Sequence, residues 1–217
     1  MKAGSLLVTR FHLLLLGVMV AITVTAFVKI GPTAGLPVHW GLNGQPDRVW
    51  PRNPALLVLP IIAVLVTGVF ALLGAVAPRE QIEGGRSVLE VVLAAVLGLF
   101  CALQFALLLI GVGSDIDMVR VVTFLVAALL VVVGLALPRS RPNVYAGIRL
   151  PWTMRDPSNW RATHRLAGVL FVIAGAGLAG LALFRPDPTS LLAGIAAGLI
   201  LPTLIGGIYS FIRARRH

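Results

Sequence analysis

Long apolar stretches alternate with short polar segments along the chain, and this pattern predicts its helices. Six stretches of 19 to 26 residues carry almost no charge, and they cover residues 11–31, 54–77, 88–113, 118–137, 166–184 and 189–212. A helix rises about 1.5 Å per residue, so roughly 20 residues cross the ~30 Å hydrocarbon core of a bilayer. In lipid only a helix satisfies its own backbone so locally. The sequence therefore predicts an all-α polytopic membrane protein with six transmembrane helices.

Composition excludes a water-soluble protein. Hydrophobic residues make up 58% of the 217 residues and charged residues only 12%, whereas soluble domains are about 45–50% apolar and about 25% charged. Six spans leave no room for a separate soluble domain. Cys101 is the single cysteine, so neither an intrachain disulfide nor a cysteine metal cluster is expected.

The first apolar stretch also has the form of a secretory signal, because Lys2 and Arg10 precede it. No clear small-residue cleavage site stands near Ala26, and Lys29 is followed by five more spans. We therefore expect the first stretch to remain as an uncleaved transmembrane helix.

Basic residues set the predicted orientation. With a cytoplasmic N-terminus, thirteen of the eighteen Lys and Arg residues fall on the inner side and five on the outer side. The positive-inside rule thus places both termini in the cytoplasm. The excess of basic residues that gives the net charge of +10 is thus explained by the orientation of the chain in the membrane. Nucleic-acid binding is therefore not predicted.

The predicted membrane interior lacks the ionisable groups that coupled transporters use. Lys29, Glu90 and Arg120 are expected in the first or last turn of their spans, where they can reach the interface. The deeper polar residues are expected to bridge helices or to bond to their own backbone, and they are Gln104, Thr23, Thr25, Thr67 and Thr123. A transporter or channel for a small molecule or peptide remains the alternative function.

Two connections are long and rich in polar and aromatic residues. They divide the chain into residues 1–77, with an outer loop at 32–53, and residues 78–217, with an inner loop at 138–165. The other connections, at 78–87, 113–117 and 185–188, are expected to be short turns. Because loops on a rigid scaffold carry function, the chemistry is expected in the two long loops.

The outer loop is expected to be a compact turn structure on the outer surface. Asn43-Gly44 and Pro46-Asp47 are turn-forming pairs. The candidate binding residues form a polar cluster between tryptophans, and they are His39, Trp40, Asn43, Asp47, Arg48 and Trp50. One His and one Asp are too few for a zinc site, so no metal is predicted.

The inner loop contains more candidate functional residues than the outer loop. Its arginines can attract anionic lipid headgroups at about 1 kcal/mol each, but that does not account for the ordered set of other residue types. Thr153 and Asp156 resemble a capping box that starts a short amphipathic helix. Trp160 and His164 should lie one turn apart on one helix face. The candidate residues of this loop are Asn143, Gly147, Arg149, Pro151, Trp152, Thr153, Trp160, His164 and Arg165.

Both loops resemble those of a known family. The outer run from Leu36 to Trp50 is similar to the small domain of unknown function that begins SdpI-type membrane proteins, and the inner run is similar to their cytoplasmic motif. Two departures are mild: Leu150 stands where the family more often has Thr, and Trp40 stands where Phe is commoner.

The resemblance implies a multi-pass protein of the bacterial cytoplasmic membrane that gives immunity to a secreted, membrane-active toxin peptide. It also implies that some members hold a transcriptional repressor at the membrane. On this basis the outer-loop residues are predicted to bind the toxin and the inner-loop residues to signal. Membrane lipid, a toxin peptide and a repressor are the expected partners, and no cofactor is expected.

Two further interpretations follow from the residues. An enzyme is not predicted, and no catalytic residue is assigned, because the acid–base candidates His39 and His164 fall on opposite sides of the membrane. Gly194 and Gly198 in the sixth span, with four glycines in the fifth, indicate close pairing of the last two helices or a homodimer face. Those four glycines are Gly168, Gly175, Gly177 and Gly180.

Overall fold

The computed structural model describes residues 6–184 and 187–215. Its long helices are α1 (Arg10–Lys29), α2 (Arg52–Val76), α3 (Arg79–Gly111), α4 (Met118–Ala136), α6 (Pro157–Leu183) and α7 (Pro188–Ala214). A single turn, η1 (Leu137–Arg139), extends α4, and α5 (Pro151–Arg155) is short. The strands β1 (Gly35–Trp40) and β2 (Pro46–Pro51) form a hairpin. All six long helices are apolar and long enough to cross a membrane, which confirms the predicted spans.

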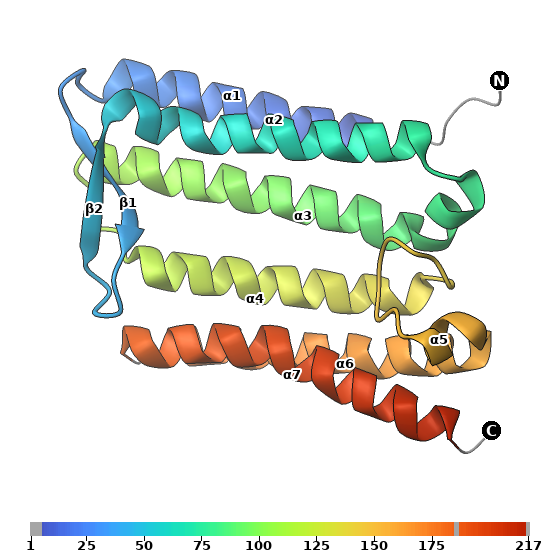
Figure 1. The fold of residues 1–217 in the computed structure, drawn as a ribbon. Coiled ribbons are helices and arrows are strands. Elements are labelled where there is room, and N and C mark those ends of the chain that lie inside the picture. The colour runs from blue at the N-terminus through green and yellow to red at the C-terminus, as the bar shows by residue number, and fades with distance from the viewer. Residues whose placement is uncertain (1–5, 185–186, 216–217) are drawn as a thin grey trace.

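The six long helices pack as two groups of three (Figure 1). Helices α1, α2 and α3 pack against one another and form the N-terminal half, and α4, α6 and α7 form the C-terminal half. Contacts between α3 and α4 join the halves. This packing places α3 with the first two helices, whereas the division drawn from the sequence placed it with the later ones.

The hairpin and the inner loop lie at opposite ends of the bundle (Figure 1). Helix α1 begins and α7 ends at the inner-loop end. We call the two ends the hairpin end and the inner-loop end. The sidedness of these ends in a membrane stays a prediction from the charge asymmetry. Lys2, Arg185 and Arg216, which were counted there, lie outside the described residues, as does part of the predicted 185–188 turn.

Three local predictions need correction. Residues 79–87 form the first turns of α3 and not a turn between spans. The hydropathy pattern did not predict this extension of α3 because its residues are polar. Arg86 stabilises the extension by pairing with Glu83 at 2.9 Å and with Glu90 at 2.8 Å. Glu90 therefore lies well inside α3. The outer loop, expected to contain turns only, forms two strands.

Close glycine contacts hold the C-terminal half together. A Cβ added at Gly134 of α4 or at Gly168 of α6 would lie 2.6 Å from the other residue's carbonyl oxygen, and one at Gly175 would lie 2.6 Å from the carbonyl oxygen of Ala127. Gly168 and Gly175 thus pack against α4, and not against α7 as the sequence indicated. Gly194 of α7 does face α6, where it meets Leu178 and Leu181.

Gln104 is the central polar residue of the N-terminal half. Its side-chain amide donates to Thr23 Oγ1 at 3.1 Å and to the Leu56 carbonyl at 2.9 Å, and it thereby ties α3 to α1 and α2. Thr23 and Thr67 donate to carbonyls of their own helices. These contacts confirm that the deep polar residues bridge helices or bond to the backbone.

A Gln104→Leu substitution is expected to change stability by less than about 1 kcal/mol. It removes two hydrogen bonds, but it also removes Gln104 Oε1, a buried atom with no partner among the described residues. Gln104→Glu should destabilise by about 2–4 kcal/mol, because a carboxylate would face the Leu56 carbonyl without a donor. Thermal unfolding of purified protein measures both, and equal melting temperatures for the two variants would contradict this account.

Candidate functional site

The hairpin is an antiparallel pair with a short turn. Leu36 pairs with Trp50 and His39 with Arg48, and the register shifts near His39. In the turn, Asn43 Oδ1 accepts the Gln45 N–H at 3.0 Å, and Gly44 takes a positive φ of 77°. The β-forming residues Val38 and Trp40 in β1 and Val49 and Trp50 in β2 favour the strands. Asn-Gly supplies the turn, as the sequence indicated.

The hairpin spans both halves of the bundle (Figure 1). Leu36 is buried among residues of α1, α2 and α3. Trp40 packs on the opposite half, against Val119 of α4 and Leu191 of α7. The turn continues this contact, since the Thr189 hydroxyl at the start of α7 donates to the Leu42 carbonyl at 3.4 Å. The hairpin therefore links the two halves at one end, and no pattern in the sequence predicted this link.

The structure brings together part of the predicted polar cluster. His39 Nδ1 and Asp47 Oδ1 lie 2.6 Å apart, and both side chains are more than half exposed. Arg48 and Trp50 are exposed on β2. Asn43 bonds within the turn. The pairing of His39 with Asp47 follows from the cross-strand register, which spacing alone did not reveal.

Arg52, which the sequence analysis did not single out, anchors the base of the hairpin. Its guanidinium donates to the Ile30 carbonyl at 2.9 Å and lies 5.1 Å from the Phe27 ring centroid. It therefore satisfies the carboxyl end of α1, where cations are favoured by the helix dipole.

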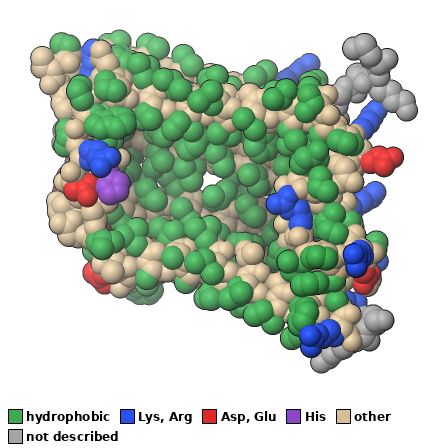
Figure 2. Space-filling view, viewed as in Figure 1, with side chains coloured by type: hydrophobic (Ala, Val, Ile, Leu, Met, Phe, Trp, Pro, Cys, Tyr) green, Lys and Arg blue, Asp and Glu red, His purple; other side chains and the backbone are tan. Residues whose placement is uncertain are grey.

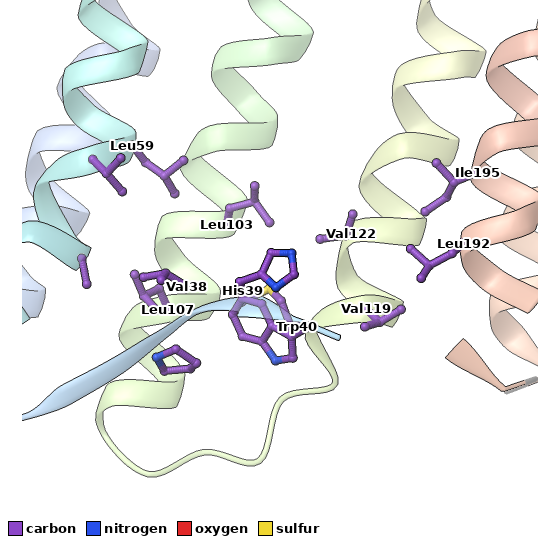
Figure 3. Close-up of a pocket in the computed structure, with 14 residues that line it drawn as sticks. Val38, His39, Trp40, Leu59, Leu103, Leu107, Val119, Val122, Leu192 and Ile195 are labelled. Atoms are coloured by element: carbon purple, nitrogen blue, oxygen red, sulfur yellow. The ribbon is translucent and has the colours of Figure 1, made fainter. Parts of the chain in front are cut away.

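A cavity of about 350 Å³ lies beneath the hairpin, between the two halves. Figure 3 shows the His39 ring projecting into it, with Leu59 and Leu103 on one side and Val122 and Ile195 on the other. Its walls come from β1, α2, α3, α4 and α7, and His39 is its one ionisable lining residue. Figure 2 shows a hollow of hydrophobic side chains between the halves on this face, with a histidine, an acidic and a basic side chain gathered beside it at the hairpin end.

At the inner-loop end, Asn143 organises the chain after η1. It is fully buried, its Oδ1 accepts the Tyr145 and Ala146 N–H groups at 2.9 and 2.8 Å, and its amide donates to the Arg141 carbonyl at 2.7 Å. It packs directly on Gly85 of α3. Asn143 thus fixes the loop against the N-terminal half.

Trp160 and His164 fix the other side of the loop and lie on one face of α6, as predicted. Their rings stack with centroids 4.0 Å apart, and both are fully buried. His164 Nδ1–H donates to the Trp160 carbonyl at 2.8 Å, while Nε2 accepts the Ile148 N–H at 2.9 Å. A neutral imidazole with its proton on Nδ1 satisfies both bonds. Trp160 Nε1–H donates to Ser140.

The predicted capping box at Thr153 is wrong. Thr153 lies inside α5, where its hydroxyl accepts the Leu150 N–H at 2.9 Å, and Pro151 begins this helix because its fixed φ suits a first turn. Asp156 instead caps α6 by accepting the Ser158 N–H at 2.7 Å. This backbone hydrogen bond lowers the pKa of Asp156.

Trp152 attaches α5 to α7. Its indole N–H donates to Ser210 Oγ at 2.8 Å, and the Asn159 amide donates to the Ser210 carbonyl at 2.9 Å. Neither Asn159 nor Ser210 was identified from the sequence, although a polar pair near the ends of two spans was the signal available. The inner loop is therefore fastened to α3, α6 and α7 together.

Burial divides the predicted inner-loop residues into two groups. Asn143, Thr153, Trp160 and His164 are fully buried and shape the loop, so none of them can contact a partner directly. Gly147, Arg149, Pro151 and Arg165 are exposed, and Trp152 lies between the two groups because it is half-buried. Arg149 donates to the Val144 carbonyl, which leaves the rest of its guanidinium at the surface.

His12 is a buried residue that was not predicted from the sequence. Its Nδ1 accepts the Thr9 N–H at 2.9 Å, and its Nε2–H donates to the Glu90 carbonyl at 3.0 Å. It thereby joins the start of α1 to α3 near the inner-loop end. A histidine within an otherwise apolar stretch was the available signal.

Comparisons with known proteins match the parts of the chain that hold the two loops to two family models. Residues 139–212, which hold the inner loop, α6 and most of α7, match the model of the SdpI/YfhL protein family. Residues 14–64, which include the hairpin, match a domain of unknown function, DUF1648. The predicted resemblance to SdpI-type proteins is thus confirmed.

A curated relative agrees with this result. The chain is 23% identical to the immunity protein SdpI of Bacillus subtilis (strain 168) over 152 residues, which are 70% of this chain and 71% of that protein. No solved structure matches the chain. Together with the six apolar helices, these matches identify a multi-pass bacterial membrane protein. The cavity beneath the hairpin is lined by residues of both matched stretches, 14–64 and 139–212, and by residues of α3 and α4 that belong to neither.

Proposed function

We propose that this protein protects a bacterial cell from a secreted, membrane-active peptide by binding the peptide at the hairpin end. The observation that carries the proposal is the apolar cavity, which is roofed by β1 and walled by helices of both halves. The curated relative bears the name of an immunity protein. Concave apolar sites with a few polar groups are the usual form of a binding site.

The charge asymmetry supports this assignment. The positive-inside rule puts the hairpin end outside the cell, where a secreted peptide arrives. His39 and Asp47 at the mouth of the cavity, with the exposed Trp50 nearby in the hairpin, supply the polar and aromatic groups that anchor protein interfaces.

The inner loop is proposed to report the bound state to the cytoplasm. It is fastened to α6 and α7, and α7 also lines the cavity at Leu192 and Ile195. The exposed Arg149 and Arg165 are the residues available to a cytoplasmic partner such as a repressor. Transport gains no support from Gln104 and Thr23, because these two polar residues bond to each other.

Immunity is tested by deleting the gene in its own bacterium and growing the deletion strain in mixed culture with its parent. We expect the deletion strain to lose at least tenfold in survival relative to the parent, and the reintroduced gene to restore it. Equal survival of deletion strain and parent would overturn the proposal.

A matched pair of variants links survival to the cavity. Leu192→Trp fills the cavity, whereas Leu65→Trp places the same side chain on the lipid-facing side of α2, where Leu65 is 62% exposed. We expect Leu65→Trp to protect fully and Leu192→Trp to protect poorly at equal membrane abundance. Equal protection by the two variants would remove the cavity from the proposal.

A further inference from the structure

We infer that the cavity beneath the hairpin takes apolar side chains of a cationic amphipathic peptide, with a basic side chain of the peptide in an adjoining aspartate-lined cavity. This inference rests on the proposed function and specifies the class of peptide. Two cavities that meet at Trp40 carry it.

The first cavity sets the apolar part of the ligand. Its volume of about 350 Å³ lies within the range of small-ligand sites, and its helical walls are aliphatic apart from Met118. His39 Nδ1 is held by Asp47, while Nε2 has no hydrogen bond to a described residue. The His39 ring can therefore bond to a polar group of the ligand at the mouth, such as a backbone amide.

The second cavity determines the charge expected of the ligand. It measures about 440 Å³ and lies between the hairpin turn, the α3–α4 connection and Pro188. Its two ionisable lining residues, Asp115 and Asp117, are both exposed and both acidic. Asp117 Oδ1 accepts the Arg120 N–H at 3.0 Å, but a carboxylate has room for further donors. A cation is attracted here, whereas the phosphate of a phospholipid is repelled.

Trp40 joins the two sites. Pro37 and Trp40 line both cavities, which are therefore direct neighbours. The face of an indole attracts cations as well as apolar groups. Because the cavities share this wall, the basic residue of the peptide should lie within about one helical turn, roughly four residues, of its large apolar residues.

Binding of two matched peptides tests the charge. The full-length protein is placed in phosphatidylcholine nanodiscs, and the probes are fluorescent peptides with one leucine-rich sequence tipped by either two lysines or two glutamates. Anisotropy is corrected for empty nanodiscs. We expect the lysine peptide to bind at least tenfold more tightly than the glutamate peptide, and this preference to shrink as salt is added.

Two variants locate the effect. Asp115→Asn with Asp117→Asn should weaken lysine-peptide binding about tenfold and should strengthen glutamate-peptide binding, because it removes the repulsion between carboxylates. It keeps the helix cap because Asn also caps well. Leu192→Trp should weaken binding of both peptides, whereas Leu65→Trp should weaken neither. Equal binding of the two peptides, or insensitivity to the aspartate substitutions, would overturn the inference.

A lipid occupant gives a different result. If a photoactivatable phosphatidylcholine labels the cavity walls and excess lysine peptide does not displace it, the cavity is a lipid site and the inference fails. Protection in mixed culture is measured separately. A chain that protects its host but binds both probes equally retains the proposed function and loses only the peptide class.

Discussion

Gly147→Ala is expected to lower the stability of the protein by about 3 kcal/mol or more. Gly147 has a φ of +113°, which L side chains rarely adopt, at a cost of about 1–2 kcal/mol. An added Cβ would also fall on His164 Nε2, the atom that accepts the Ile148 N–H. Displacing this ring leaves a buried donor unpaired, which costs about 1–3 kcal/mol more. Its stacking partner Trp160 would lose its position as well.

Gly113→Ala is the matched control for this substitution. Gly113 also has a positive φ, +96°, but an added Cβ there has no neighbour within 4 Å. Only the backbone penalty should appear, so the melting temperature should fall by a few degrees, against about 10 °C for Gly147→Ala. Intrinsic tryptophan fluorescence of detergent-purified protein measures both. Equal falls would show that contact with His164 contributes nothing.

Gly168→Val is expected to disrupt the C-terminal half. The α4 carbonyl of Gly134 lies where the new Cβ would stand, and Pro138 closes the same space from the side. A backbone carbonyl cannot rotate away as a side chain can, so the two helices must separate. Overpacking of this kind costs about 1–3 kcal/mol and sometimes more. We expect a fall in melting temperature of at least 6 °C and a loss of monodisperse protein on size exclusion.

Gly177→Val places the same side chain on the same helix without the collision. An added Cβ at Gly177 has no neighbour within 4 Å. Because glycine itself weakens a helix interior by about 0.5–1 kcal/mol, this variant should be neutral or slightly more stable. If Gly177→Val destabilised as much as Gly168→Val, close packing of α4 on α6 would not be the cause.

Periodicity and charge were enough to predict the membrane spans, because hydrophobic length is a local property of the chain. The pairing of Trp160 with His164 was also predictable, since residues four apart share a helix face. The fully buried state of both residues was not predictable, because it depends on Ser140 and Ile148 arriving from a separate segment.

In the outer loop, too, contacts between distant segments could not be predicted from the sequence. Asn43-Gly44 indicated a turn, but the contact of His39 with Asp47 depends on a register shift within the hairpin. The role of Trp40 depends on Val119 and Leu191, which lie far along the chain. Residue types marked the loop as the candidate site, while only the tertiary structure shows the cavity beneath it.

The hollow between the two halves has a thermodynamic consequence. Lipid chains are as apolar as leucine, so in a bilayer they wet this surface before any ligand arrives. A ligand that enters from the bilayer exchanges one apolar neighbour for another and does not leave water. The heat-capacity change of binding should therefore be small, in contrast to sites that are buried from water. Selectivity at such a site must come from shape and charge, and hydrophobicity alone would leave every lipid tail as a competitor.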